Sequence, residues 1–269
     1  MIQVTVLAIS DLTIQHRKTM IVQNIEMSVD EGDWFALVGE SGSGKSVTAA
    51  AIGGLLPREL KAASGSILLD GKNLVNLKER ELRKYRGTVI SYIFQDYQGA
   101  FTPFMKIGAQ LDEMLRTHTN HSKKERKERA LHSLKLVELP EERVYNSYSF
   151  QLSGGQLQRA AIAMAMILEP KLLIADEPTT ALDSMTAANI LQLMADLKEK
   201  AGCAVFFITH DLRHVRKYAN KVAIMRNGVI VESGMKSNVF HQPKHEYTKA
   251  LFEAIPSLRK TSARLSSHL

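Results

Sequence analysis

The stretch from Gly39 to Ser46, GESGSGKS, constrains the fold of this chain more than any other. It follows the short apolar run WFALV and precedes an alanine-rich run of helical character. Strand, glycine loop and helix start are the context in which the pattern G-x-x-x-x-G-K-S forms a phosphate-binding loop. The glycines let backbone N–H groups face an anion, and the following helix adds the positive end of its dipole. The sequence therefore predicts a nucleotide site in which Lys45 contacts the β- and γ-phosphates and the Ser46 hydroxyl binds Mg²⁺.

The composition is that of an ordinary globular protein, with 45% hydrophobic and 23% charged residues. No apolar segment reaches the roughly 18 residues that span a bilayer, and the first residues lack the pattern of a secretion signal. The single cysteine, Cys203, excludes an intrachain disulfide and is expected to be a small buried residue. These features predict a protein of a reducing cytosol.

The formal net charge of +7 would suit an anionic partner such as a nucleotide, a nucleic acid or a lipid surface. Much of this excess lies in KKERKER, from Lys123 to Arg129. Because Glu125 and Arg129 stand four residues apart on a predicted helix, this cluster is more typical of a solvated helix face than of a nucleic-acid site. We therefore expect no nucleic-acid partner.

The order of strand-like and helix-like runs predicts an α/β protein. Short β-type runs between Ile2 and Val38, followed by GSILLDGKNL, predict an antiparallel sheet beside the phosphate loop. Helical periodicity then predicts a helical subdomain over approximately residues 94–168. Beyond it, apolar strands alternate with helices, which predicts a parallel sheet covered on both faces, and a final hairpin turns at Asn227–Gly228. We expect one domain over residues 1–269.

Two further motifs suggest that the nucleotide is hydrolysed. LLIADEPTTALD ends an apolar strand in Asp176 and Glu177, where Mg²⁺ needs a ligand and an attacking water needs a base. LSGGQ, from Leu152 to Gln156, places two glycines behind a serine at a helix start, which makes a second array of N–H groups facing an anion. A chain with one nucleotide would then have one phosphate site too many.

The ordered set of motifs resembles the ATP-binding subunit of an ABC transporter, over nearly the whole chain. It comprises GESGSGKS, Gln95 in YIFQD, LSGGQ, LLIADE, ALD and His210 in FFITHD. The resemblance implies a P-loop NTPase with a RecA-like core, an antiparallel β subdomain and a helical subdomain that carries the signature LSGGQ. The resemblance also explains the second phosphate site at LSGGQ, because in that family two cassettes face each other head to tail and the signature of one closes on the ATP of the other.

The resemblance also implies a role for each motif residue, with ATP and Mg²⁺ as cofactors. Glu177 would polarise the attacking water beside His210 and Gln95. His16 stands where the family usually has an aromatic residue that stacks on adenine. Mg²⁺ would be held by Ser46, Gln95 and Asp176. The other implied nucleotide contacts are Gly39, Glu40, Ser41, Gly42, Ser43, Gly44, Lys45, Ser46 and Val47, with Ser153, Gly154, Gly155 and Gln156 of the signature serving the partner's ATP and Asp183 linking the two sites across the interface.

The C-terminal tail, residues 235–269, narrows the branch of the family. HQPKHEYTKALFEAIP is similar to the P-x-H-P-Y-T-x-x-L ending of oligopeptide, dipeptide and nickel importers, with Glu246 in place of the usual proline. Peptide members commonly continue into a cysteine-rich extension, which does not follow Leu269. We therefore expect the nickel or metal-chelate branch, with nickel, cobalt, zinc or a metallophore complex as cargo and peptides as the alternative.

The resemblance implies a membrane complex on its cytoplasmic face. The partners would be a second cassette, either a different chain or a second copy, two permeases and an extracellular substrate-binding protein. Phe101, Pro103 and Phe104 are expected to be exposed and to dock on a permease, the alternative being that they pack against the helical subdomain. The competing class is an ABC ATPase of DNA repair or translation. Repair proteins insert long coiled-coil arms between phosphate loop and signature, and translation factors carry two cassettes, so neither fits.

Overall fold

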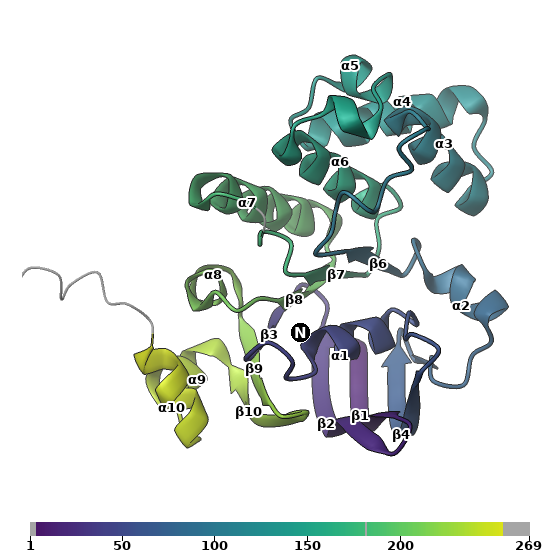
Figure 1. The fold of residues 1–269 in the computed structure, drawn as a ribbon. Coiled ribbons are helices and arrows are strands. Elements are labelled where there is room, and N and C mark those ends of the chain that lie inside the picture. Colours follow the sequence, from purple (N-terminus) through teal and green to yellow (C-terminus); the bar gives the residue numbers. More distant parts are fainter. Residues whose placement is uncertain (1–3, 181, 255–269) are drawn as a thin grey trace, which may run out of the picture.

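The computed structural model describes residues 4–180 and 182–254, which form two β-sheets with helices around them (Figure 1). The larger sheet has six strands in the order β10-β9-β3-β8-β7-β6. Strands β9, β3, β8, β7 and β6 run parallel, and β10 pairs antiparallel with β9. Its strands are β3 (Trp34–Val38), β6 (Ile90–Ile93), β7 (Leu172–Asp176), β8 (Ala204–Ile208), β9 (Lys221–Arg226) and β10 (Val229–Met235).

The smaller sheet is antiparallel, with four strands in the order β2-β1-β4-β5. They are β1 (Thr5–His16), β2 (Thr19–Asp30), β4 (Leu60–Leu69) and β5 (Lys72–Asn73). The sequence placed Trp34–Val38 in this sheet, and that assignment is wrong, because β3 pairs in parallel with β8 and β9. All five residues of β3 are buried, as is typical of a strand covered on both faces.

Alternating side chains of the central strands fill two separate cores. On β3, Trp34, Ala36 and Val38 join the larger hydrophobic cluster, whereas Phe35 and Leu37 join the cluster next to the antiparallel sheet. This division follows from the two-residue period of a strand. The parallel strands β3, β7 and β8 are therefore fully buried, and the loops at their carboxyl edge are the natural place for a site.

Helices α3 (Ile107–His118), α4 (Lys123–Leu136), α5 (Glu141–Tyr145) and α6 (Gly154–Met166) gather at the end of the molecule opposite the antiparallel sheet (Figure 1). A short 3-10 turn, Ser149–Gln151, precedes α6. These helices lie within the range 94–168 expected for a helical subdomain. The remaining helices are α1 (Lys45–Ile52), α2 (Glu79–Tyr85), α7 (Ser184–Ala201), α8 (Leu212–Tyr218), α9 (Lys236–His241) and α10 (Glu246–Glu253).

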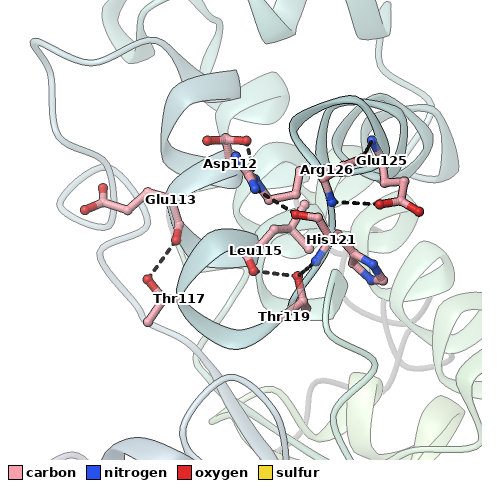
Figure 2. Close-up of polar contacts among 9 residues, drawn as sticks. Asp112, Glu113, Leu115, Thr117, Thr119, His121, Glu125 and Arg126 are labelled. Atoms are coloured by element: carbon pink, nitrogen blue, oxygen red, sulfur yellow. Dashed lines mark hydrogen bonds and ion pairs between the residues drawn. The ribbon is translucent and has the colours of Figure 1, made fainter.

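Polar contacts fix the connection between α3 and α4 (Figure 2). Arg126 on α4 pairs with Asp112 on α3 at 2.7 Å and donates to the carbonyl of His121 at 2.8 Å. Glu125 accepts from the N–H of Ser122 at 2.7 Å and completes a capping box at the start of α4. The basic run is therefore an exposed helix face, as predicted, but Glu125 caps the helix at its N-terminus.

Three further predictions concern the β9–β10 hairpin, Cys203 and membrane-spanning segments. The β9–β10 hairpin turns at Asn227 and Gly228, whose φ values of 49° and 83° are those of a type I′ turn, which confirms the prediction. Cys203 is buried, as predicted, and burial raises the pKa of its thiol to about 11. Among the described residues, no helix is long and apolar enough to cross a bilayer.

The expectation for the segment after Gln95 is only half right. Phe104 is 89% exposed, whereas Phe101 is 4% exposed and packs into the core of the helical region. Gln110 explains the difference, because its side chain bonds to the backbone N–H and C=O of Thr102 and to the C=O of Met105. These bonds fix the turn between the two phenylalanines, of which one is buried and the other exposed.

Candidate functional site

The phosphate loop connects β3 to α1 and is shaped by its glycines. Gly42 and Gly44 have φ values of 77° and 108°, which favour glycine. A Cβ on Gly39 would lie 2.1 Å from the carbonyl oxygen of Met225 on β9, so a side chain has no room there. The loop is thus pressed against the neighbouring strand and opens on its other side, where its N–H groups and the start of α1 favour an anion.

Lys45, the first residue of α1, is 5% exposed and folded back onto the loop. Its Nζ donates to the carbonyl oxygens of Gly39 and Glu40, at 2.9 and 2.6 Å, and to Ser43 Oγ at 3.3 Å. Burial lowers the pKa of Lys45, and the nearby charge of Glu177 opposes that shift. The ammonium group is therefore held in place by backbone dipoles at the floor of the loop.

Asp176 ends β7 opposite the phosphate loop. One of its oxygens accepts from Ser46 Oγ at 3.2 Å, and the other accepts from Tyr92 Oη at 3.1 Å. Asp176 is 7% exposed, and burial raises its pKa although both hydrogen bonds act in the opposite direction. A hydroxyl and a carboxylate within hydrogen-bond distance form the kind of oxygen donor pair that Mg²⁺ shares with phosphates.

Magnesium needs few protein ligands, and the residues present fit that requirement. Among the residues that the structure describes, no three or more His, Cys, Asp or Glu side chains are arranged to hold a metal ion by themselves. Ser46, Asp176 and the neighbouring Gln95 would instead supply part of a shell that substrate phosphates complete.

Glu177 has an unusual backbone conformation that turns it out of the strand. Its φ is 46°, in the left-handed region that non-glycine residues rarely adopt, and its N–H donates to the carbonyl of Ile208. Its Oε2 accepts from Thr180 Oγ1 at 2.8 Å and lies 3.4 Å from Nδ1 of His210. Strain of this kind concentrates at functional sites. The result is a carboxylate held by two neighbours from different loops.

The groups described above surround one cleft of about 610 Å³, within the range of small-molecule sites. Its lining brings together most of the residues expected to serve the chain's own nucleotide. They are Gly39, Glu40, Ser41, Gly42, Gly44, Lys45, Ser46, Val47, Gln95, Glu177 and His210, with Ile21 in addition.

Asp176, His16 and Ser43 are the expected residues of this group that do not line the cleft, although Asp176 adjoins it through its hydrogen bond with Ser46. Ser43 is buried beneath Lys45, whereas His16 ends β1, where it pairs with Thr19 and Leu60. Ile21 on β2 lines the cleft and was not foreseen. The adenine contact of His16 stays a prediction.

The signature residues lie apart from the phosphate-loop cleft. Ser153 caps α6 by accepting from the N–H of Gln156 at 3.3 Å, and Gln156 bonds back to the N–H of Ser153. Asp183 caps α7 by accepting from the N–H groups of Met185 and Thr186, and Thr186 Oγ1 lowers its pKa. These residues do not line the phosphate-loop cleft.

The two caps lie side by side on an exposed surface. A Cβ on Gly155 would meet Thr186 Cγ2 at 3.6 Å, so the start of α6 adjoins the start of α7. Ser153 and Gly154 are exposed. Phe150 and Met185 flank them and are 72% and 76% exposed. Apolar residues this exposed are a common mark of a binding surface.

Sequence reasoning missed Tyr92 and Thr180, which hold the two carboxylates. Tyr92 stands opposite Ile174 in the β6–β7 pairing, two residues before Asp176. Strand order could have suggested this contact, had the pairing been known. Thr180 follows Glu177 by three residues, but the left-handed turn that joins them has no simple sequence signal.

Comparison with known proteins places this geometry in context. Residues 22–180 match the model of the family described as ABC transporter. Residues 231–268 match the oligopeptide/dipeptide transporter C-terminal region.

Two curated relatives cover most of the chain. The oligopeptide transport ATP-binding protein OppD of Bacillus subtilis is 44% identical, over 97% of this chain and 75% of its own length. The metal-staphylopine import system ATP-binding protein CntD of Staphylococcus aureus is 40% identical, over 92% of each chain. Among solved structures, a dimeric ATP-binding cassette in a post-hydrolysis state, bound to ADP and Pi, superposes with a TM-score of 0.75. It is 32% identical, over 85% of this chain and 98% of that one.

Proposed function

The chain belongs to the ABC transporter family as the ATP-hydrolysing subunit of an importer, and we propose that it powers uptake of metal chelates or small peptides. The observation that carries this proposal is that Lys45, Ser46 and Glu177 line one cleft, with Asp176 hydrogen-bonded to Ser46 beside it. Relatives named for transport of oligopeptides and dipeptides and for import of metal-staphylopine support an importer over a repair or translation ATPase.

ATP binding exchanges the partners of Lys45. In the structure its ammonium bonds to loop carbonyls, which are neutral acceptors. Phosphate oxygens are charged acceptors and form stronger bonds, so they would draw the ammonium group into the cleft. Ser46, Asp176 and Gln95 would hold Mg²⁺, which neutralises phosphate charge.

Hydrolysis requires a base beside the γ-phosphate, and Glu177 lines the cleft where one is needed. The oxygen of a water attacks the γ-phosphorus, the bond to the bridging oxygen of ADP breaks, and the water proton passes to the Glu177 carboxylate. Thr180 and His210 hold this carboxylate from two sides and so limit its rotation.

We propose that a second cassette covers the signature surface. Phe150 and Met185 supply apolar contact area, while Gly154 and Gly155 present backbone N–H groups at the start of α6 to the partner's phosphates. The dimeric form of the similar cassette bound to ADP and Pi supports this arrangement. The partner is a different chain or a second copy, and the complex includes two permeases and an extracellular binding protein.

Docking on the permease would place the chain at the cytoplasmic face of the membrane. In the segment after Gln95, Phe104 is the apolar side chain that faces outward. Gln95 itself lines the cleft and lies only a short stretch before Phe104 in the sequence. A permease contact at Phe104 would therefore be coupled to Gln95 and to the nucleotide state. Phe101 is excluded from this role by its burial.

Uptake by the complex in lipid vesicles tests the proposal. We expect ATP to drive entry of a labelled nickel chelate or a labelled dipeptide, and a Lys45→Ala chain to lose uptake. Removing this charge contact to phosphate weakens ATP binding by roughly 2–3 kcal/mol, about 100-fold. ATP hydrolysis without uptake of either compound would contradict the substrate class.

A second variant tests docking in the same assay. Phe104→Ser should leave ATP binding by the isolated chain intact but weaken association with the permease. Met235→Ser is the matched control, because Met235 is also an exposed apolar side chain and lies at the end of β10, outside both the cleft lining and the signature surface. A Phe104→Ser complex that assembles and transports normally would contradict docking at Phe104.

A further inference from the structure

The tail brings one side chain directly to the phosphate loop. Tyr247 lies on α10, and its Oη accepts a hydrogen bond at 3.2 Å from the backbone N–H of Glu40, a residue 207 positions earlier. Tyr247 is 7% exposed. It belongs to the segment that matches the oligopeptide/dipeptide transporter C-terminal region, and the nucleotide chemistry described above does not use it.

Contacts made by Glu232, His245 and Arg226 fix the position of Tyr247. Glu232 on β10 accepts from the N–H groups of Lys244 and His245, at 2.9 and 3.1 Å, which ties the start of α10 to the sheet. His245 Nδ1 then accepts from the N–H of Tyr247 and caps the helix. The guanidinium of Arg226 lies 4.7 Å from the centre of the tyrosine ring. The ring is thus held between β9 and the phosphate loop.

The bond acts on the peptide group that also holds Lys45. The carbonyl of the Gly39–Glu40 peptide accepts from Lys45 Nζ at 2.9 Å, and the N–H of the same peptide donates to Tyr247. A peptide group is planar, so fixing its N–H fixes the direction of its carbonyl. Gly39 packs closely against Met225, and Tyr247 and Lys45 hold this peptide group at its N–H and its carbonyl.

We propose that Tyr247 is a positioning residue for the phosphate loop, through which the tail orients the Gly39–Glu40 peptide and thereby Lys45. The expected effect is on ATP binding, so the inference rests on the proposed ATPase function and adds Tyr247 to the residues that support it. The hydroxyl remains neutral near pH 7, because burial raises the pKa of Tyr247. The acceptor is therefore a neutral oxygen that does not compete with phosphate for the lysine.

A purely structural role for Tyr247 predicts a different behaviour. If the ring only anchors α10, then Tyr247→Phe, which keeps the ring and its contact with Arg226, should change nothing at the nucleotide. If the hydroxyl orients the loop, the same change should weaken ATP capture, because a neutral hydrogen bond is lost at a loop whose geometry the ligand requires.

The test compares Tyr247→Phe with Tyr218→Phe in the full chain. Tyr218 is a matched control, since its Oη donates to the carbonyl of Ala188 at 3.3 Å, away from the cleft lining. ATPase kinetics and hydrogen exchange of the peptide covering Glu40 are measured for both. We expect Tyr247→Phe to raise the KM for ATP about three- to tenfold. It should change kcat less and accelerate exchange at Glu40 without a general increase.

Other outcomes would overturn the inference. Values for Tyr247→Phe equal to those of Tyr218→Phe would show that the hydroxyl has no role. Faster exchange at Glu40 with unchanged KM would show that the loop does not need the tail. Faster exchange throughout the chain would assign Tyr247 to anchoring alone. A wild-type chain that fails to hydrolyse ATP would instead contradict the proposed function, and the exchange result would still report on the hydrogen bond.

Discussion

The phosphate loop and the signature are both helix starts suited to an anion, but the fold treats them differently. At the loop, Lys45 is 5% exposed and its ammonium is satisfied by the chain's own carbonyls. At the signature, Ser153 and Gly154 are exposed, and their flanking residues Phe150 and Met185 present apolar surface outward. The ammonium of the phosphate loop is thus enclosed by its own chain, whereas the signature lies on the exposed surface.

The difference indicates which step, ATP binding or ATP hydrolysis, requires a second chain. The phosphate-loop cleft collects Lys45, Ser46 and Glu177 from a single chain, so we expect one chain to bind ATP by itself. The signature residues do not line that cleft, so we expect them to contact a nucleotide held by another chain. We infer that binding is a property of one chain and that hydrolysis is a property of two.

The strongest test of this contrast acts on the enclosed site. Glu177→Gln keeps the shape of the side chain and removes the base, so turnover should fall by about 10²–10⁴-fold while ATP still binds. Glu113→Gln, at an exposed position on α3, is the control and should behave as wild type. Turnover of the assembled complex and ATP binding by the isolated chain are measured. Near-normal turnover in Glu177→Gln would remove Glu177 from the mechanism.

A smaller effect is expected at the exposed site. Gly155→Glu places a negative charge where the partner's phosphates would approach, and the fold has room for it beside Thr186. Turnover of the complex should fall by about 10²-fold, the lower end of what the loss of one transition-state donor costs, and so by less than the loss of the base can cause. ATP binding by the isolated chain should stay at the wild-type value.

Gly155→Ala separates charge from bulk in that experiment. The added methyl group makes an ordinary contact at 3.6 Å with Thr186 Cγ2, so the decrease in turnover should be smaller than with glutamate. Weaker ATP binding by the isolated Gly155→Glu chain would break the contrast, because the signature would then belong to the chain's own site.

The smallest expected effect is on stability and pH. Burial raises the pKa of Asp176, so its ionised form destabilises the nucleotide-free fold. A raised pKa in the folded state means that stability is fully present below the unfolded pKa and falls as pH rises through the folded value. Asp176→Asn should therefore be more stable than wild type at pH 7, by about 0.5–2 kcal/mol, with an advantage that shrinks toward pH 4.

Asp30→Asn provides a control of opposite sign. Burial raises the pKa of Asp30, but hydrogen bonds from Lys221 and Thr5 outweigh it and lower the pKa overall. Its charge therefore stabilises the fold above the unfolded pKa, and that stability is lost as pH falls. Thermal unfolding at several pH values should show Asp30→Asn below wild type at pH 7. An Asp176→Asn chain less stable than wild type at pH 7 would contradict the cost assigned to the buried carboxylate.

Much of the fold and most of the cleft could be predicted because their signals are local. The loop from Gly39 to Ser46, the acids at the end of β7 and the turn at Asn227 and Gly228 are encoded by neighbouring residues. Sequence patterns gave wrong predictions where the local residues suit two structures equally well. The run WFALV suits either sheet, and Phe101 and Phe104 are identical side chains whose directions depend on the clamp made by Gln110.

The sequence by itself determined the chemistry of this protein, since a phosphate loop, a strand-end acid pair and a signature each need only a few adjacent residues. The tertiary structure alone decided which groups support that chemistry. Tyr92 on Asp176, Thr180 on Glu177 and Tyr247 on the Gly39–Glu40 peptide meet through strand order, a left-handed turn and a docked tail. The physical reason is distance along the chain: contacts between segments 84 or 207 residues apart leave no periodic pattern, and they form only when the sheet brings those segments together.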